Sequence, residues 1–203
     1  MNQKTITPLI AENLPGWFSR AECNKLYSIT VNSEGDILEI GHFLGRSTAC
    51  ICQGLRESGK VRVFNSYDLA FESDESFKSF YEQVHETDID SCELLTKYVF
   101  PHNTNATAVA KSNLGQYDLD QYVNLIAGDF SILDSSMYSL IFSDAMHDPN
   151  EIRINLPHIK ERSKKGCIWA FHDMNQENIE VVLSMSESKL IDTADSLGVF
   201  SYQ

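Results

Sequence analysis

The chain has 203 residues, of which 42% are hydrophobic, and this is enough to build one sizeable core, so we expect a single domain over residues 1–203. The formal net charge is −13, from 16 basic and 29 acidic residues, and it argues against nucleic acid as a partner because phosphate binding needs a basic face. No apolar stretch approaches the ~18–20 residues of a membrane span, so we expect no membrane partner.

The N-terminal residues and the cysteines both indicate the cytoplasm. The stretch "MNQKTITPLIAENLPGW" lacks the basic region and long apolar core of a signal peptide. The five cysteines include no C-x-x-C pair, and an odd number without a framework pattern is typical of a reducing compartment. We therefore expect a cytoplasmic protein, and the sequence leaves open whether it is a monomer or a homo-oligomer.

The predicted elements alternate between helix and strand along the chain. Residues 1–34 contain a helix that Ser19 caps, with Glu22 three residues later. Further helices are expected over 46–59, 149–166 (closed by Gly166) and 175–188. Short apolar runs predict five strands, at 35–41, 61–68, 121–130, 139–145 and 167–173, and the tail 189–203 reads as a hairpin of two more.

Strands that are apolar almost throughout need cover on both faces, which is typical of parallel sheets. We therefore predict an α/β, Rossmann-like, doubly wound fold. Its mostly parallel seven-stranded sheet carries helices on both faces and ends in an antiparallel C-terminal hairpin.

Residues 71–120 are longer than an ordinary connection, and we expect an insertion that resembles a lid. Helices are predicted over 75–88 and 92–100, and "PHNTNATAVAKSNLGQYD" (101–118) is predicted as a loop. Four aromatic residues lie at roughly helical spacing and favour a core role over a substrate wall: Phe71, Phe77, Phe80 and Tyr81.

Acidic residues recur where the predicted parallel strands end. Ligands bind beyond the carboxyl ends of such strands, so a row of acids there indicates a site. These residues are Asp68, Asp129, Asp144 and Asp173, with His147 and His172 beside the last two. Structural roles are the alternatives: His147 could satisfy the following loop, His172 could be a packed histidine, and Asp148 is best interpreted as the cap of the helix that begins at Pro149.

The stretch "ILEIGHFLGRST" (37–48) combines a strand, a glycine turn and a helix start. Gly41 and Gly45 allow close approach of a ligand, and the amides of Arg46, Ser47 and Thr48 at the helix start attract an anion. The spacing is not the G-x-G-x-x-G of dinucleotide sites. Glu39 would repel phosphate, but it could meet an ammonium group or hold the loop by hydrogen bonds.

At these residues the sequence resembles the class I S-adenosylmethionine-dependent methyltransferases. Their E/D-x-G-x-x-x-G turn, which holds the amino-acid end of the cofactor, is matched by Glu39, Gly41 and Gly45. The resemblance implies that Asp68 binds the ribose hydroxyls and that the Gly128–Asp129 pair lies by the adenine amino group. Ser47, Thr48 and Asp144 complete the residues that we expect around S-adenosylmethionine.

More narrowly, "FSDAMHD" and "AFHD" resemble the branch of macrocin-type sugar O-methyltransferases and cephalosporin-hydroxylase-like proteins. There the D-x-x-H pattern, here Asp144 and His147, supplies a magnesium ligand and a general base. A second acidic pair completes the metal site, and His172–Asp173 stands in its place. Asp144, Asp173 and His172 are thus the candidate ligands, although Mg²⁺ prefers oxygen, so the histidine leaves the metal open.

The resemblance implies O-methylation of a sugar or small metabolite, with Mg²⁺ lowering the pKa of the hydroxyl and His147 accepting its proton. A non-catalytic S-adenosylmethionine-binding protein is the main alternative, because His172 replaces an acid. A nicotinamide dehydrogenase is a weaker one, given the glycine spacing. Trp17 could pack on the cofactor or against the first helix.

Overall fold

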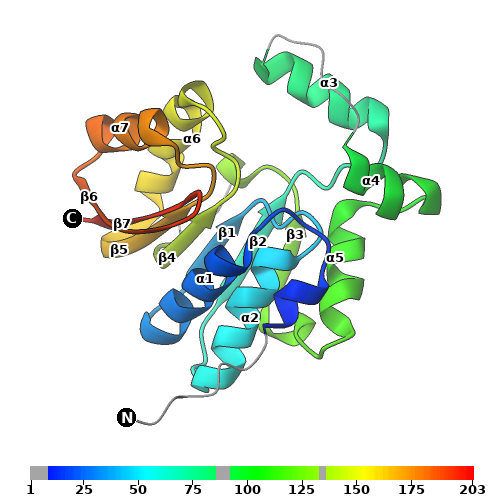
Figure 1. The fold of residues 1–203 in the computed structure, drawn as a ribbon, viewed down its shortest axis with the longest axis horizontal. Helices are drawn as coiled ribbons and strands as arrows, with labels where there is room; N and C mark the ends of the chain where they lie inside the picture. The colour runs from blue at the N-terminus through cyan, green and yellow to red at the C-terminus, as the bar shows by residue number, and fades with distance from the viewer. Residues whose placement is uncertain (1–8, 86–91, 133–135) are drawn as a thin grey trace.

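The computed structural model describes residues 9–85, 92–132 and 136–203, and these form one sheet with helices on both faces (Figure 1). The strand order is β3-β2-β1-β4-β5-β7-β6. The strands are β1 (Ile37–Ile40), β2 (Phe64–Asp68), β3 (Asn124–Ala127), β4 (Tyr138–Ser143), β5 (Ser163–Phe171), β6 (Ser188–Ala194) and β7 (Leu197–Tyr202). The predicted fold class is therefore confirmed.

The order of the strands reverses between β1 and β4. From β1 the chain moves outward to β2 and β3, and it then returns to the other side of β1 to form β4 and β5. These five strands are parallel, whereas β7 runs antiparallel between β5 and β6. Ile40 pairs with both Tyr67 and Ser143, so the carboxyl ends of β2, β1 and β4 lie level. A crevice is expected at such a reversal.

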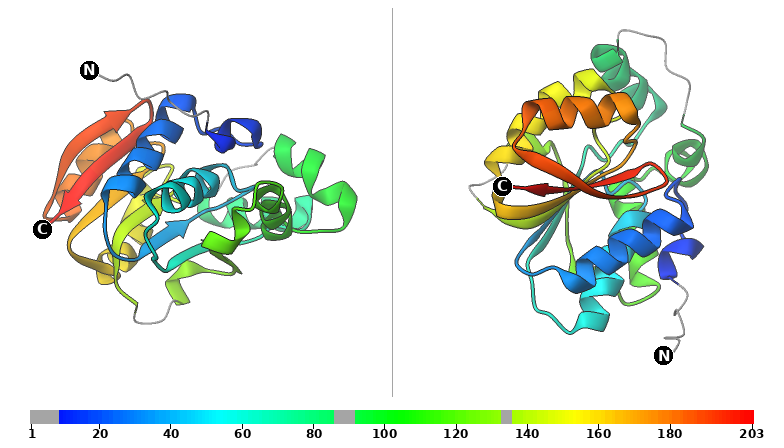
Figure 2. Two further views of the ribbon diagram at one scale, coloured as in Figure 1. Left: turned by 90° about the horizontal axis from the view of Figure 1, so that it is seen from below. Right: turned by 60° about the vertical axis from the view of Figure 1, so that its left-hand side comes forward.

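Two helical layers cover the sheet (Figure 2). The helices are α1 (Arg20–Asn32), α2 (Arg46–Ser58), α3 (Asp74–His85), α4 (Glu93–Tyr98), α5 (Ala106–Gly115), α6 (Pro149–Glu161) and α7 (Gln176–Met185). Buried side chains of α1, α2 and α5 pack on one face of the sheet, and those of α6 and α7 pack on the other. Alternate residues of β1 supply both cores, with Ile37 in the first and Leu38 in the second.

Helices α3 and α4 lie beyond the carboxyl edge of the sheet (Figure 1). They share a small apolar cluster around the buried Leu44, Leu95 and Val99, and Phe71 and Phe77 pack against it. Phe77 therefore has the expected core contacts. Phe71 shares them, but Phe71 and Phe80 also line the large cavity described below, so for these two the expected core role is incomplete. The side chain of Tyr81 lies outside the described residues. A lid-like role for 71–120 stays a prediction.

The prediction of a loop over 101–118 is wrong, because α5 occupies most of it. Asn105 caps this helix: its side chain accepts a hydrogen bond of 2.9 Å from the amide of Ala108. The buried small residues Ala106 and Ala110 let the helix approach the glycine turn closely. The Asn- and Thr-rich start of the segment reads as a loop, but physically it is a helix cap.

The predicted end of α6 at Gly166 is also wrong. The helix ends at Glu161, and β5 begins at Ser163 instead of Cys167. Tyr138 of β4 pairs with Ser163 and Leu140 pairs with Ile168, so β5 carries extra residues in a bulge. Gly166, at a φ of +81°, lies in this bulge. Pairing with β4 therefore extends the strand through a stretch that alone resembles a helix terminus.

Two further expectations concern the membrane and the cysteines. Among the helices of the described residues, none has the length and apolar character needed to cross a bilayer. All five cysteines are free thiols, and all except Cys92 are buried.

Candidate functional site

The carboxyl ends of β1, β2 and β4 border a cavity of about 280 Å³. Segments far apart in the sequence meet there: Gly41 follows β1, Asp68 ends β2, Asp129 follows β3 and Asp144 follows β4. His147 and Gly128 also line it, as expected. Among its described lining residues there is no Lys or Arg, so the polar part of the wall is mainly acidic.

A second cavity of about 50 Å³ adjoins the first at Gly41 and Asp144, which line both. It is bordered by the loop between β1 and α2 and by the segment that precedes α1. Its wall consists of Gly16, Trp17, Phe18, Gly41, His42, Phe43, Leu44, Arg46, Ser47 and Asp144. The indole of Trp17 stacks on Phe43 at a centroid distance of 5.1 Å, so Trp17 belongs to this site and not to a staple of the first helix.

The glycine turn depends on two backbone conformations that favour glycine. Gly41 has a φ of +88° and Gly45 a φ of +94°. A Cβ on Gly41 would also lie 3.0 Å from the carbonyl oxygen of Asp144, so a larger residue would push β4 away. Gly45 is the N-cap of α2 and provides no side-chain cap for the first amides of the helix, and the next two residues, Arg46 and Ser47, line the small cavity.

Glu39 supports this turn from behind. Its carboxylate is fully buried and accepts hydrogen bonds from Ser47 Oγ (2.7 Å), Thr48 Oγ1 (2.7 Å) and Ser66 Oγ (2.6 Å). Burial is the main reason why the pKa of Glu39 is raised to about 7; the three hydroxyls partly offset it. Glu39, Gly45 and Thr48 do not line either cavity. The sequence allowed two roles for Glu39, contact with an ammonium group or support of the loop. Its hydrogen bonds correspond to support of the loop.

Asp68 joins the ends of β1 and β2. Its Oδ2 accepts from the amide of Phe43 and its Oδ1 from the amide of Ala70, each at 2.8 Å. Phe43 and Ala70 both have positive φ, so these bonds stabilise two unusual backbone conformations. Asp129 similarly accepts from the amide of Ser131. Both carboxylates still line the large cavity.

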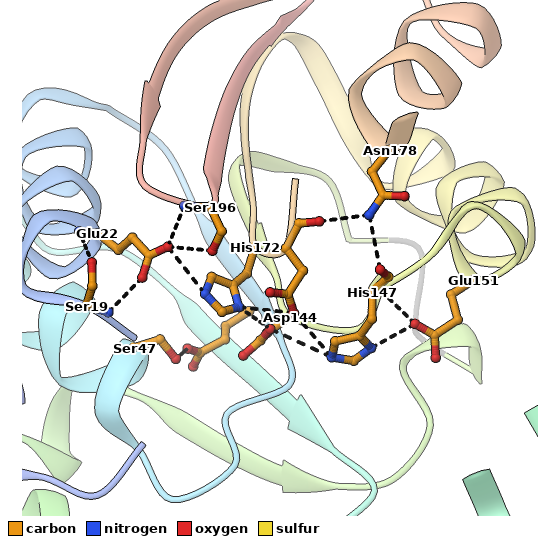
Figure 3. Close-up of polar contacts among 11 residues, drawn as sticks. Ser19, Glu22, Ser47, Asp144, His147, Glu151, His172, Asn178 and Ser196 are labelled. Carbon is orange, nitrogen blue, oxygen red and sulfur yellow. Dashed lines mark hydrogen bonds and ion pairs between the residues drawn. The ribbon is translucent and has the colours of Figure 1, made fainter. Parts of the chain in front are cut away.

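His172 lies between acidic residues of three elements (Figure 3). Its Nδ1 is 2.8 Å from Asp144 Oδ1 and 3.5 Å from Asp173 Oδ2, and its Nε2 is 3.4 Å from Glu22 Oε1. Burial alone would lower the pKa of His172, but the bonds to Asp144, Asp173 and Glu22 outweigh it and raise the pKa to about 12. The ring is thus a cation that holds these carboxylates together.

His147 faces the same carboxylates from the loop just before α6. Its Nδ1 and its backbone amide both lie 2.7 Å from Glu151 Oε2, and its Nε2 lies 3.9 Å from both Asp144 and Asp173. Burial would lower the pKa of His147, but the bond to Glu151 and the nearby carboxylates raise it to about 9. Asp148 caps α6 as expected, accepting from two amides of the first turn.

Three side chains are placed to hold a cation. One ligand atom from each of Asp144, His147 and Asp173 lies within 4.8 Å of the others. Two of these atoms are carboxylate oxygens, which suit a hard divalent cation. His172, the third ligand predicted from the sequence, is outside this group because its two ring nitrogens face carboxylates.

Sequence reasoning missed three residues that organise the site. Glu22 was interpreted only as part of a helix cap, and its contact with His172 has no sequence signal. Glu151 follows His147 at the i,i+4 spacing of one helix face, which could have identified it. Asn178 on α7 donates to the carbonyls of His147 and Asp173 at 3.1 and 2.7 Å, joining both loops.

A sequence model described as a methyltransferase domain matches residues 38–174, most of the chain and both halves of the site. The chain belongs to this methyltransferase family. The predicted enzyme class, a methyltransferase of the S-adenosylmethionine-dependent type, is thereby confirmed. The match does not distinguish the macrocin-type branch from the rest of the family. No curated protein sequence matches this methyltransferase significantly.

Solved structures share the fold at low sequence identity. An S-adenosylmethionine-dependent O-methyltransferase from Thermotoga maritima is 15% identical, with a TM-score of 0.61, over 98% of this chain and 72% of that chain. An O-methyltransferase from Bacillus cereus, solved with S-adenosylhomocysteine, is 14% identical, with a TM-score of 0.58, over 99% and 94%. One from Streptomyces achromogenes, involved in tomaymycin synthesis and solved with S-adenosylmethionine, is 15% identical, with a TM-score of 0.53, over 90% and 78%.

Proposed function

We propose that this methyltransferase transfers the methyl group of S-adenosylmethionine to a hydroxyl of a small molecule, a sugar or a secondary metabolite. The observation that carries the proposal is the shared cavity. Asp68 and Asp129, which match the cofactor-binding acids of the family, line the same 280 Å³ space as Asp144 and His147. A donor and an acceptor bound there would be neighbours.

The cofactor half of the cavity suits an adenosine without phosphates. A carboxylate accepts hydrogen bonds from vicinal hydroxyls or from an exocyclic amine, but it repels phosphate. We assign Asp68 to the ribose hydroxyls and Asp129 to the adenine amino group, with Gly128 allowing close approach. Gly41, Ser47 and Asp144 border the adjoining small cavity, which suits the amino-acid end. Glu39, Gly45 and Thr48 contribute by fixing the turn.

His147 is the proposed general base for the acceptor hydroxyl. Methyl transfer from a sulfonium is an in-line displacement, so the protein chiefly aligns the reactants and removes the hydroxyl proton. Glu151 orients the ring by binding Nδ1, which leaves Nε2 directed at Asp144 and Asp173. With a pKa of about 9, His147 is mostly protonated at neutral pH before ligands bind. A sulfonium nearby lowers that pKa, because a like charge disfavours the protonated form.

The donor set near the acceptor position fits a divalent cation such as Mg²⁺. Asp144 and Asp173 would hold it through oxygen, with His147 at the edge of the group. When bound, such an ion lowers the pKa of an alcohol that contacts it. His172 fits the role of a hydrogen-bond donor to Asp144 better than that of a ligand.

The charge of the chain and of the cavity favours a small acceptor over nucleic acid. The net charge is −13, and acidic groups dominate the polar cavity wall, so a polyanion would be repelled. The structural neighbours include an O-methyltransferase involved in tomaymycin synthesis.

Titration calorimetry with S-adenosylmethionine tests the proposal directly. We expect binding by the wild-type chain and at least about tenfold weaker binding by Asp68→Asn, because a carboxylate forms stronger hydrogen bonds than an amide. The His147→Asn variant should keep cofactor affinity and lose release of S-adenosylhomocysteine with any accepted hydroxyl compound. A folded wild-type chain that does not bind the cofactor would contradict the proposal.

A non-catalytic cofactor-binding protein is the second candidate, and one observation favours it. His172 stands where related enzymes place an acid, and its Nδ1 lies 2.8 Å from Asp144 Oδ1. This candidate predicts cofactor binding without turnover on a broad panel of sugars and phenols, with His147→Asn indistinguishable from wild type in cell extracts.

A further inference from the structure

Arg46, the first residue of α2, is the single Arg or Lys among the described residues that line either cavity of the site. It borders the small cavity beside Gly41, Ser47 and Asp144. The predictions from sequence used only its position at the helix start, and the proposed function leaves its side chain without a role.

The Arg46 side chain is held in place but is not saturated with hydrogen bonds. Its Nη1 donates to the carbonyl of Leu14 at 2.9 Å. Gly16 presses on the aliphatic stem: a Cβ there would lie 3.0 Å from both Cβ and Cδ of Arg46. The Nε atom is buried and, within the described residues, donates to no acceptor. A buried donor of a charged group without an acceptor is costly, so an acceptor is expected to complete it.

The charges around the small cavity match a zwitterion. Arg46 provides one positive group, and Asp144, which also borders the large cavity, provides one negative group. The other basic side chain in the wall, His42, has both ring nitrogens bound, to Ser66 at 3.0 Å and Thr107 at 2.9 Å. The amides at the start of α2 add partial positive charge on the side of Arg46. The amino-acid end of the cofactor carries a carboxylate and an ammonium group of this kind.

We propose that Arg46 binds the carboxylate of S-adenosylmethionine, with Trp17 closing the small cavity over it. This inference rests on the proposed function and adds a residue to it. In this arrangement Nε of Arg46 donates a hydrogen bond to the cofactor carboxylate. Nη1 keeps its bond to the carbonyl of Leu14 and so holds the segment before α1 beside the site. The protein should therefore discriminate between S-adenosylmethionine and decarboxylated S-adenosylmethionine, which keeps the adenosine, the sulfonium and the amine.

A cycle of two variants and two ligands, measured by titration calorimetry, separates this role from a purely structural one. In the wild-type chain we expect S-adenosylmethionine to bind at least about tenfold more tightly than its decarboxylated analogue, as for one charge-assisted contact. In Arg46→Gln the two ligands should bind with equal affinity, and the affinity for the decarboxylated analogue should differ from that of the wild-type chain by less than about twofold. Arg46→Lys keeps the charge and should recover part of the discrimination.

Arg56 offers a matched control on the same helix. Its Nη1 also donates to a backbone carbonyl, that of Tyr117 at 3.2 Å, and it lines neither cavity. Arg56→Gln makes the same change in net charge and should leave both affinities unchanged.

Each remaining outcome is decisive. Equal binding of both ligands by the wild-type chain overturns the role of Arg46 and leaves the proposed function intact. Equal weakening of both ligands by Arg46→Gln assigns Arg46 to the fold instead, and it likewise overturns the inference. If neither ligand binds the folded wild-type chain, the proposed function itself fails.

Discussion

The carboxylate of Glu22 on α1 lies 3.4 Å from Nε2 of His172, whose Nδ1 lies 2.8 Å from Asp144 at the end of β4. The same carboxylate accepts hydrogen bonds from the amide of Ser19, which completes the cap of α1, and from Ser196 in the turn between β6 and β7. One buried side chain therefore connects the first helix, the C-terminal hairpin and, through His172, the acidic residue Asp144 at the end of β4 (Figure 3).

Replacing Glu22 should cost stability. In Glu22→Gln one carboxylate oxygen becomes an NH₂ group, so either Ser19 or Ser196 loses an acceptor and the His172 cation loses a counter-charge. We expect a loss of about 2 kcal/mol in the free energy of unfolding, measured with urea. Ser19→Ala is the control, because it removes the hydroxyl that caps the amide of Glu22 and binds Asp195 but leaves the contact of Glu22 with His172; it should cost about 1 kcal/mol. Equal losses in the two variants would show that Glu22 acts only through the cap.

The contact between Glu22 and His172 should make the free energy of unfolding depend on pH. The pKa of His172 is raised to about 12 in the folded chain, because its carboxylate partners outweigh burial. A raised histidine pKa stabilises the fold fully below the unfolded value of about 6.5, and this contribution decreases as pH rises above it. The pKa of Glu22 is lowered to about 2, since its hydrogen bonds to His172, Ser196 and Ser19 outweigh burial, so its contribution decreases below about pH 4.5.

We therefore expect the stability difference between wild type and His172→Gln to be largest between about pH 4.5 and 6.5. Above this window it should shrink by at most about 1.4 kcal/mol per pH unit. Urea unfolding at pH 5.5, 7.0 and 8.5 measures it. A difference that stays constant over this range would mean that the pKa of His172 is the same in the folded and unfolded chain.

The strands and their acids could be predicted from the sequence because both depend on local pattern. Apolar runs bounded by glycine or an acid gave β1, β2 and β4, and parallel strands bring such ends to one edge, so Asp68 and Asp144 could be expected together. The start of β5 could not be predicted, because Lys164, Lys165 and Gly166 resemble a helix terminus until pairing with β4 is known.

The rest of the site depends on contacts between distant segments. The contact of Glu22 with His172 spans most of the chain and follows from how α1 packs beside β4 and the hairpin. The cover of the small cavity by Trp17 likewise depends on the segment before α1. Asn105 was different: its capping signal was local, but the turn-forming residues around it concealed a short helix.

Metal affinity should respond to His172. Its ring donates to Asp144 Oδ1 and places a positive charge beside the candidate ligands Asp144, His147 and Asp173. In a Glu22→Gln background, His172→Asp removes that charge and adds an oxygen ligand, so Mn²⁺ should bind at least about tenfold more tightly. Electron paramagnetic resonance of free Mn²⁺ measures this, and adding Asp173→Asn should reverse the gain. Unchanged affinity would show that the three side chains do not hold a cation.

Intrinsic fluorescence should report occupation of the small cavity. The chain has two tryptophans: Trp169 is fully buried, whereas Trp17 is 66% exposed and stacks on Phe43 beside the cavity. S-adenosylmethionine should shift the emission to shorter wavelength, because a bound ligand removes water from the indole. 5′-Methylthioadenosine, which lacks the amino-acid end, should change it much less. In Trp17→Phe, which keeps an aromatic ring on Phe43, the response should disappear; if it persists, it arises at Trp169 and the cofactor does not reach Trp17.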